Sequence, residues 1–136
     1  MDLPTIYNFF CNKYPVLKLI KLIITPYSPA LEYEGRCEYH TLNNWSNDKN
    51  KYRQCSIKVV NIEIVDHGDK VFTLIHEISH ALVPHYEKKV KGKYIHVEHS
   101  HMFYEKFHEL LKVAYDNSIV NKMYDLKKLK LVDKCK

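Results

Sequence analysis

The stretch that decides the fold is "CSIKVVNIEIVDHGDKVFTLIHEISHAL", residues 55–82, in which the spacing of apolar residues changes halfway. Over 55–66 the residues alternate with a period of two, which predicts a strand with at least one buried face. The turn "DHGD" at 66–69 ends this strand. From Asp69 onward apolar residues recur every three or four positions, which predicts an amphipathic helix with Asp69 as its N-cap. Pro84 ends this helix.

This predicted helix carries two histidines four residues apart, with a glutamate directly after the first: His76, Glu77 and His80. Residues i and i+4 share one face of a helix, so the two imidazoles can meet at one metal ion. Glu77 is rotated by about 100° from His76, which favours contact with a water on the ion over contact with the ion itself. This is the HExxH arrangement of zinc hydrolases, with Glu as general base. The alternative is a surface helix with incidental histidines.

A catalytic zinc needs three protein ligands and one open position for water. Candidates for the third ligand crowd into "YIHVEHSHMFYEKFHELL", residues 94–111. His99 is the first choice, because it opens the apolar face of a helix expected from about Ser100. His101 is the main alternative and lies on a flank of that helix. The other candidates are His85, His96, Glu98 and Glu105.

The remaining elements follow from the same patterns, and together they predict an α+β fold. We expect, in chain order, a helix over 4–14, a strand over 16–25 (or a helix there), a loop over 25–30, a strand over 33–40, a polar loop over 43–51, a lysine-rich loop within 87–94 and a last helix in the tail from 123. No internal repeat or second domain is seen, so residues 1–136 are expected to form a single domain.

The composition is that of a folded protein with a basic surface. Of the 136 residues 46% are hydrophobic and 12% aromatic, and 21 basic residues against 16 acidic give a net charge of +5. Only Arg36 and Arg53 are arginines, so the lysine excess is typical of an AT-rich genome, such as that of a large DNA virus or a low-GC microbe. The lysines are therefore weak evidence for nucleic-acid binding, and we interpret most of them as a solvated surface.

The first residues show neither a basic segment followed by an apolar core nor a membrane span. The most apolar stretch, "VLKLIKLIIT" at 16–25, is short and broken by Lys18 and Lys21. We therefore expect a soluble intracellular protein, cytoplasmic or nuclear, with no membrane partner.

The four cysteines, Cys11, Cys37, Cys55 and Cys135, form no CxxC pair, which rules out a zinc ribbon. Reduced thiols are the preferred interpretation. A single Cys37–Cys55 bridge between neighbouring strands is the alternative.

With these residues in place, a resemblance becomes specific. "TLIHEISHAL" (73–82) followed by "HSHMFYEKFHELL" (99–111) resembles the SprT-like and WLM families of small zincin metallopeptidases. In those families HExxH is followed by a histidine before x-x-x-[FW], here His99 and Phe103. The resemblance covers residues 33 to 115. It implies a small zincin-like domain with a short mixed or antiparallel sheet of about three strands, packed on the HExxH helix and a second ligand-bearing helix.

By the same resemblance, His76, His80 and His99 would bind Zn²⁺, and Glu77 would be the catalytic base of a zinc metalloendopeptidase. Its substrates would be proteins or peptides, including proteins crosslinked to DNA, as in DNA–protein crosslink repair. Lysines at 88–93 and in the tail at 127–136 would then make non-specific DNA contacts. An oxyanion stabiliser is also needed, and the candidates are Tyr94, Tyr104, His101 and His85. The strand before the helix is expected to be an edge to which an extended substrate adds.

Two other classes of function compete with hydrolysis. A non-catalytic zinc module that binds other proteins would have four protein ligands, for example His76, His80, His99 and His101. A small basic nucleic-acid-binding protein would hold no metal at all.

Overall fold

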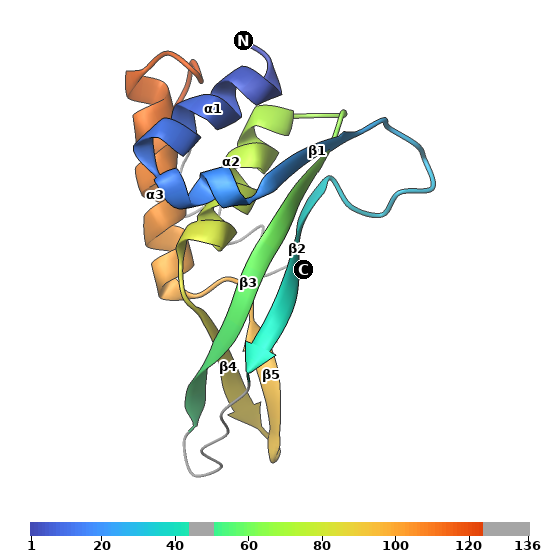
Figure 1. The fold of residues 1–136 in the computed structure, drawn as a ribbon, viewed down its shortest axis with the longest axis vertical. Helices are drawn as coiled ribbons and strands as arrows, with labels where there is room; N and C mark the ends of the chain where they lie inside the picture. Colours follow the sequence, from blue (N-terminus) through green and yellow to red (C-terminus); the bar gives the residue numbers. More distant parts are fainter. Residues whose placement is uncertain (44–50, 124–136) are drawn as a thin grey trace.

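The computed structural model describes residues 1–43 and 51–123, with no side chain described for 41–43, 55 and 56. Its elements are α1 (Leu3–Lys13), a 3₁₀ helix (Pro15–Leu19), β1 (Lys21–Thr25), β2 (Gly35–Asn43), β3 (Tyr52–Val65), α2 (Lys70–Leu82), β4 (His85–Val90), β5 (Lys93–Val97) and α3 (His101–Asp116) (Figure 1). The predicted α+β class is confirmed. The loop predicted at 43–51 falls almost wholly, and the tail helix wholly, outside the described residues.

The 14-residue strand β3 organises the sheet. Its C-terminal part pairs in parallel with β1, from Lys21 opposite Asn61 to Thr25 opposite Val65, and antiparallel with β2. Its N-terminal part pairs with β4, which pairs in turn with β5. The sheet is therefore mixed, with five strands and the order β1-β3-β4-β5, and β2 lies on β3 outside this path.

Our prediction of about three strands was wrong because the lysine-rich segment 87–94 is not a loop. It forms the hairpin of β4 and β5, in which Val90 lies opposite Lys93. The two residues between them, Lys91 and Gly92, both have positive φ, 51° and 79°. Such a two-residue turn matches the right-handed twist of paired strands. The lysines fit a half-buried strand because their apolar stems can cover neighbouring surface while the ammonium groups stay in water.

The strand predicted over 16–25 begins only at Lys21. Residues Pro15–Leu19 form a 3₁₀ turn instead, and Leu17 is fully buried in it. The Tyr7 hydroxyl of α1 lies 2.8 Å from the carbonyl oxygen of Leu17 and 2.9 Å from that of Ile20. This tertiary contact holds the tight turn, whereas the isoleucines that favoured a strand lie after it.

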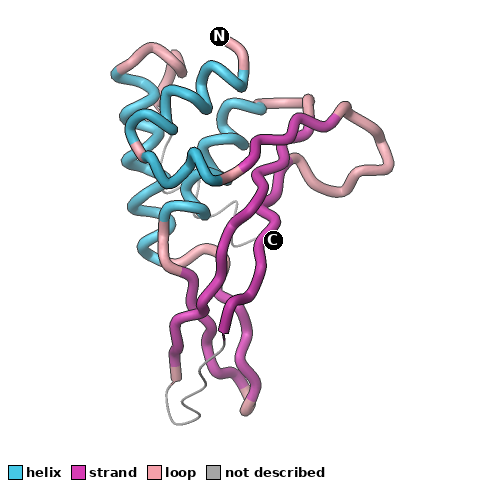
Figure 2. The backbone as a smooth tube through the Cα atoms, viewed as in Figure 1, coloured by secondary structure: helices cyan, strands magenta, loops and turns pink. Residues whose placement is uncertain are grey.

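The three helices cover one part of the sheet, and the β4–β5 hairpin extends beyond them (Figures 1 and 2). α2 is central and packs on α1, α3, β2 and β3. The core between the layers consists mainly of Phe10, Ile62, Ile64, Leu74, Ile75, Ile78, Phe103, Phe107, Leu110 and Leu111, which are at most 1% exposed. Among the described helices, none has the length and apolar character to cross a membrane.

Strand β2 comes unusually close to α2 at Gly35. A Cβ atom built at Gly35 would lie 2.6 Å from the Cγ2 atom of Thr73 and 3.2 Å from the carbonyl oxygen of Glu63. Only glycine fits between a strand and a helix at this separation. The close contact brings the following residues of β2 alongside the HExxH segment.

Candidate metal centre

Three imidazoles converge from two helical segments. His76 and His80 lie on α2, and His99 lies two residues before α3. The Nε2 atoms of His80 and His99 are 3.2 and 3.3 Å from Nε2 of His76. Nitrogen ligands at the usual distance from a tetrahedral zinc lie about 3.3 Å apart. Among the residues that the structure describes, these three form the only group of this kind suited to a metal ion.

A metal explains this geometry better than hydrogen bonds do. Nε2 of a neutral imidazole is either a donor or an acceptor, so Nε2 of His76 cannot bond to both neighbouring nitrogens. A bound cation would instead use one lone pair from each ring. Burial, followed by the neighbouring imidazole of His76, lowers the pKa of His80 to about 2. His80 is therefore neutral at any physiological pH, as a metal ligand must be.

The aromatic residue four positions after His99 is Phe103, which packs against all three imidazoles. Its ring stacks on His80 with centroids 4.2 Å apart, and it also lies 5.0 Å from the ring of His76 and 4.9 Å from that of His99. Phe107 lies 5.2 Å from His76 on the same side. Both phenylalanines are fully buried in α3. They form an apolar support that limits the rotation of the three imidazoles.

Glu77 lies beside the triad without belonging to it. Its residue is only 7% exposed, and it borders the same cleft of about 230 Å³ as the three histidines. The cleft is also lined by Gly35, Arg36, Cys37 and Tyr39 of β2, by His85 and His96 of the hairpin, and by Glu98. Glu77 therefore shares a cleft with the three histidines.

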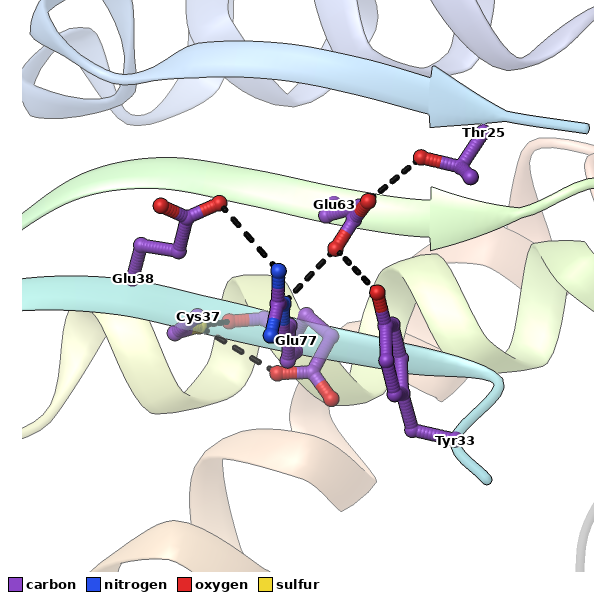
Figure 3. A network of polar contacts seen from close by, with 7 residues as sticks. Thr25, Tyr33, Cys37, Glu38, Glu63 and Glu77 are labelled. Carbon is purple, nitrogen blue, oxygen red and sulfur yellow. Dashed lines mark hydrogen bonds and ion pairs between the residues drawn. The ribbon is translucent and has the colours of Figure 1, made fainter. Parts of the chain in front are cut away.

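Cys37 of β2 contacts Glu77 directly. Its Sγ atom lies 3.2 Å from Oε2 and 3.3 Å from the backbone oxygen of Glu77 (Figure 3). Burial, and then the Glu77 carboxylate, raises the pKa of the Cys37 thiol well above its ordinary value, so the thiol stays protonated and donates. Sequence reasoning did not connect these residues, which are 40 positions apart.

The alternative of a Cys37–Cys55 bridge was wrong. Cys37 is a free cysteine. The strand register places it opposite Ile62, whereas Cys55 lies opposite His85 in another part of the sheet.

Of the candidates for the third ligand, the structure brings His99 to the pair and turns His101 away. The His101 side chain is 78% exposed, and its Nε2 atom lies 2.7 Å from Oε1 of Glu105 on the helix surface. His101 is thus outside the triad and does not line the cleft. His96 and Glu98 border the cleft without joining the triad.

Of the four candidates for oxyanion stabiliser, only His85 borders the cleft. Its Nε2 atom lies 2.8 Å from the backbone oxygen of His80, and its Nδ1 atom lies 3.2 Å from Nε2 of His96. Burial lowers the pKa of His85, against the opposing effect of the bond to His80. The Tyr94 ring packs instead under Arg53, whose Cζ atom lies 3.7 Å from the ring centroid of Tyr94. The pairing of His85 with His96 follows from the hairpin, which the sequence analysis missed.

The strand before α2 is not an edge, contrary to our expectation. β1 pairs with the C-terminal part of β3, and β2 pairs with most of the length of β3. β4 pairs with the N-terminal end of β3. Among the described strands, β2 pairs with β3 alone. The edge beside the cleft is therefore β2.

Comparison with known proteins gives no matching family model, no matching curated protein and no matching solved structure.

Proposed function

We propose that this protein is a zinc-dependent peptidase with a zincin-like centre, in which His76, His80 and His99 hold the metal and Glu77 is the general base. The observation that carries the proposal is the spacing of the three Nε2 atoms, 3.2 and 3.3 Å, beside a buried carboxylate. The residue types fit zinc, since three imidazoles with an open fourth position are typical of catalytic zinc sites.

The chain's own residues supply the rest of the chemistry. When bound, zinc lowers the pKa of a coordinated water to about 7 and so supplies a nucleophile near neutral pH. Glu77 would take a proton from the attacking water as its oxygen bonds to the peptide carbonyl carbon, and would pass that proton to the nitrogen that leaves as the C–N bond breaks. Phe103 and Phe107 keep water away from the rear of the triad, because both side chains are fully buried there.

The substrate is proposed to bind as an extended segment along β2. Gly35, Arg36, Cys37 and Tyr39 of this strand border the cleft, and β2 is an edge among the described strands. An extended peptide can form hydrogen bonds with the open backbone groups of such an edge. Bound in this way, the peptide presents its carbonyl groups to the metal centre, whatever side chains it carries. This binding mode favours unfolded or flexible protein segments as substrates.

An open coordination position separates this proposal from a non-catalytic zinc module. The module would use His101 as a fourth ligand, and the contact of His101 with Glu105 on the helix surface argues against that. His101 would have to give up this contact to reach the cation.

The first test is the variant Glu77→Gln with zinc content and hydrolysis of dye-labelled casein measured on the same samples. We expect one zinc per chain in both proteins, because Glu77 is not a ligand, and a fall in kcat of at least about 100-fold. Glu105→Gln is the control, since Glu105 is an exposed carboxylate on α3. Full activity in Glu77→Gln, or no zinc in the parent protein, would contradict the proposal.

A DNA-associated substrate is a narrower form of the proposal, supported by the hairpin. Tyr52, Lys88 and Ile95 stand in one row across β3, β4 and β5, and the tyrosine and isoleucine are more than half exposed. The Nζ atoms of Lys51 and Lys88 lie 5.8 and 6.0 Å from the Tyr52 ring. Basic side chains beside an exposed aromatic ring suit phosphates and unstacked bases. The basic tail at 127–136 lies outside the described residues.

The DNA proposal is tested by the salt dependence of binding to a short single-stranded DNA. With about four phosphate contacts to a single strand, we expect binding to weaken about 50-fold between 50 and 200 mM salt. Lys51→Gln with Lys88→Gln should reduce that slope, because these two lysines lie beside the Tyr52 ring. The pair Lys18→Gln and Lys112→Gln removes the same charge elsewhere and should not. No measurable binding, or equal effects of the two pairs of substitutions, would contradict the DNA proposal and leave the proposal of peptide hydrolysis unchanged.

A further inference from the structure

We propose that Cys37 is a positioning residue for hydrolysis: its thiol donates a hydrogen bond to the Glu77 carboxylate and holds that carboxylate in place beside the metal centre. This inference rests on the proposed function and extends it to a residue outside α2, on strand β2. Nothing in the HExxH pattern indicates such a partner.

The contact is direct and lies at the border of the cleft. Sγ of Cys37 is 3.2 Å from Oε2 of Glu77, within the range of a hydrogen bond donated by a thiol, and 3.3 Å from the backbone oxygen of the same residue. The single thiol proton gains more from the charged carboxylate than from the neutral carbonyl. The raised pKa of Cys37 means that the proton is present near neutral pH.

The backbone brings the two side chains together through a matched repeat of β2 and α2. Gly35 meets Thr73, and Cys37 meets Glu77. Two residues along a strand advance about 6.8 Å, and four residues along a helix advance about 6 Å. Gly35 and Cys37 therefore share one face of β2, while Thr73 and Glu77 share one face of α2. The close approach at Gly35 allows the thiol to reach the carboxylate.

The opposite face of the sheet fixes β2 from behind. Glu63 of β3 accepts hydrogen bonds from Nε of Arg36 at 2.7 Å, from the Tyr33 hydroxyl at 2.9 Å and from the Thr25 hydroxyl at 2.5 Å (Figure 3). Arg36 is the neighbour of Cys37 and points to the other side of the strand. Cys37 is therefore presented by a strand that is held on both faces.

A thiol suits this task better than a charged donor would. The S–H group is a weak donor, so it orients the carboxylate while leaving most of its negative charge available to the water. A lysine or arginine at the same position would neutralise that charge and compete for the proton acceptor. A methyl group would remove this hydrogen bond to the carboxylate.

The test compares Cys37→Ala and Cys37→Ser with the parent chain, using zinc content and the kcat and KM for dye-labelled casein. We expect Cys37→Ala to lower kcat about 10-fold with KM and zinc content unchanged. Cys37→Ser should recover part of the loss, since its hydroxyl can donate to the same oxygen. Cys11→Ala removes the other described free cysteine, which is buried on α1, and should leave kcat unchanged.

A second measurement examines the contact without relying on activity. The S–H stretching band in the infrared spectrum is sensitive to hydrogen bonding, and the band lost in Cys37→Ala assigns Cys37. We expect Glu77→Gln to shift that band to higher frequency and to leave the Cys11 band in place. A band that does not move overturns the inference, as does a Cys37→Ala variant with kcat within twofold of the parent. If the parent chain is inactive while the band shifts, the error lies in the proposed function and the positioning role falls with it.

Discussion

At the scale of single residues, His99 and His101 show how one cap decides which histidine joins the cluster on α2. Ser100 between them is the N-cap of α3, with an extended backbone and a side chain that accepts a hydrogen bond from the Phe103 amide at 3.2 Å. His99 thus precedes the helix and reaches α2, whereas His101 belongs to the first turn and faces solvent with Glu105. Two residues on either side of a single residue with an extended backbone can therefore lie in different environments.

This difference predicts that only one of the two histidines matters for metal binding. His99→Ala should weaken zinc binding at least about 100-fold, because it leaves two imidazoles where a catalytic site needs three ligands. His101→Ala should change the affinity by less than twofold. Competition with a coloured chelator at fixed pH measures both constants. Equal losses in the two variants would mean that His101 enters the site when the cation binds.

At the scale of secondary structure elements, β2 connects the sheet to the candidate centre through its two faces. One face meets α2 at Gly35 and Cys37, and the other carries Arg36 into the network around Glu63. The Glu63 residue is only 8% exposed, and its partners come from β1, from β2 and from Tyr33 just before β2. A single carboxylate therefore holds the three strands β1, β2 and β3 in register.

Glu63 predicts a pH dependence of stability. Its partners, first of all the Thr25 hydroxyl, hold the pKa of the Glu63 carboxyl below the ordinary value. The resulting stabilisation is complete above about pH 4.3, the pKa of a glutamate in an unfolded chain, and is lost as the pH falls through the lower pKa of the folded protein. Glu63→Gln should lower the free energy of unfolding at pH 7 by about 1–3 kcal/mol.

The measurement is urea unfolding between pH 7 and pH 3. We expect the difference between the parent and Glu63→Gln to shrink as the solution becomes more acidic. Glu38→Gln serves as the matched control, because Glu38 is more exposed and its contact with Arg36 is long, at 4.0 Å. A difference that stays constant with pH would mean that Glu63 stabilises the sheet without its charge.

At the scale of the whole molecule, the candidate centre lies where α2, the segment before α3 and the β4–β5 hairpin meet. α2 supplies two imidazoles, the segment before α3 supplies the third, and the hairpin closes one side of the cleft with His85 and His96. The hairpin itself extends beyond the helices (Figure 1). A cation bound by the triad would therefore add a link between α2 and the segment that follows the hairpin.

Zinc is accordingly expected to stabilise the fold. At a free zinc concentration of about 1,000 times Kd, binding contributes about 4 kcal/mol to the free energy of unfolding. For a chain of this size that corresponds to a rise in Tm of about 10 °C. Thermal unfolding with zinc and with a chelator measures the shift. His99→Ala should abolish most of it, and an equal shift in that variant would place the cation elsewhere.

The sequence predicted well wherever a local pattern determines the structure. The strand at 55–66, the turn at 66–69, the Asp69 cap and the helix that follows all depend on residues within a few positions of each other. The convergence of His76 and His80 follows from helical spacing alone. The segment 87–94 was predicted to be a loop because its composition is polar, although the positive φ at Lys91 and Gly92 makes it a hairpin.

By itself, then, the sequence determined the α+β class, the HExxH helix and the placement of Glu77 next to two potential ligands, because each depends on the period of one helix or strand. Only the tertiary structure decided that His99 and not His101 completes the triad, that β2 and not β3 is the edge beside the cleft, and that Cys37 contacts Glu77. These features depend on strand pairing and on the separation of β2 from α2. Both are set by contacts between residues far apart in the chain, such as Gly35 with Ile64 and Cys37 with Glu77, which no local period records.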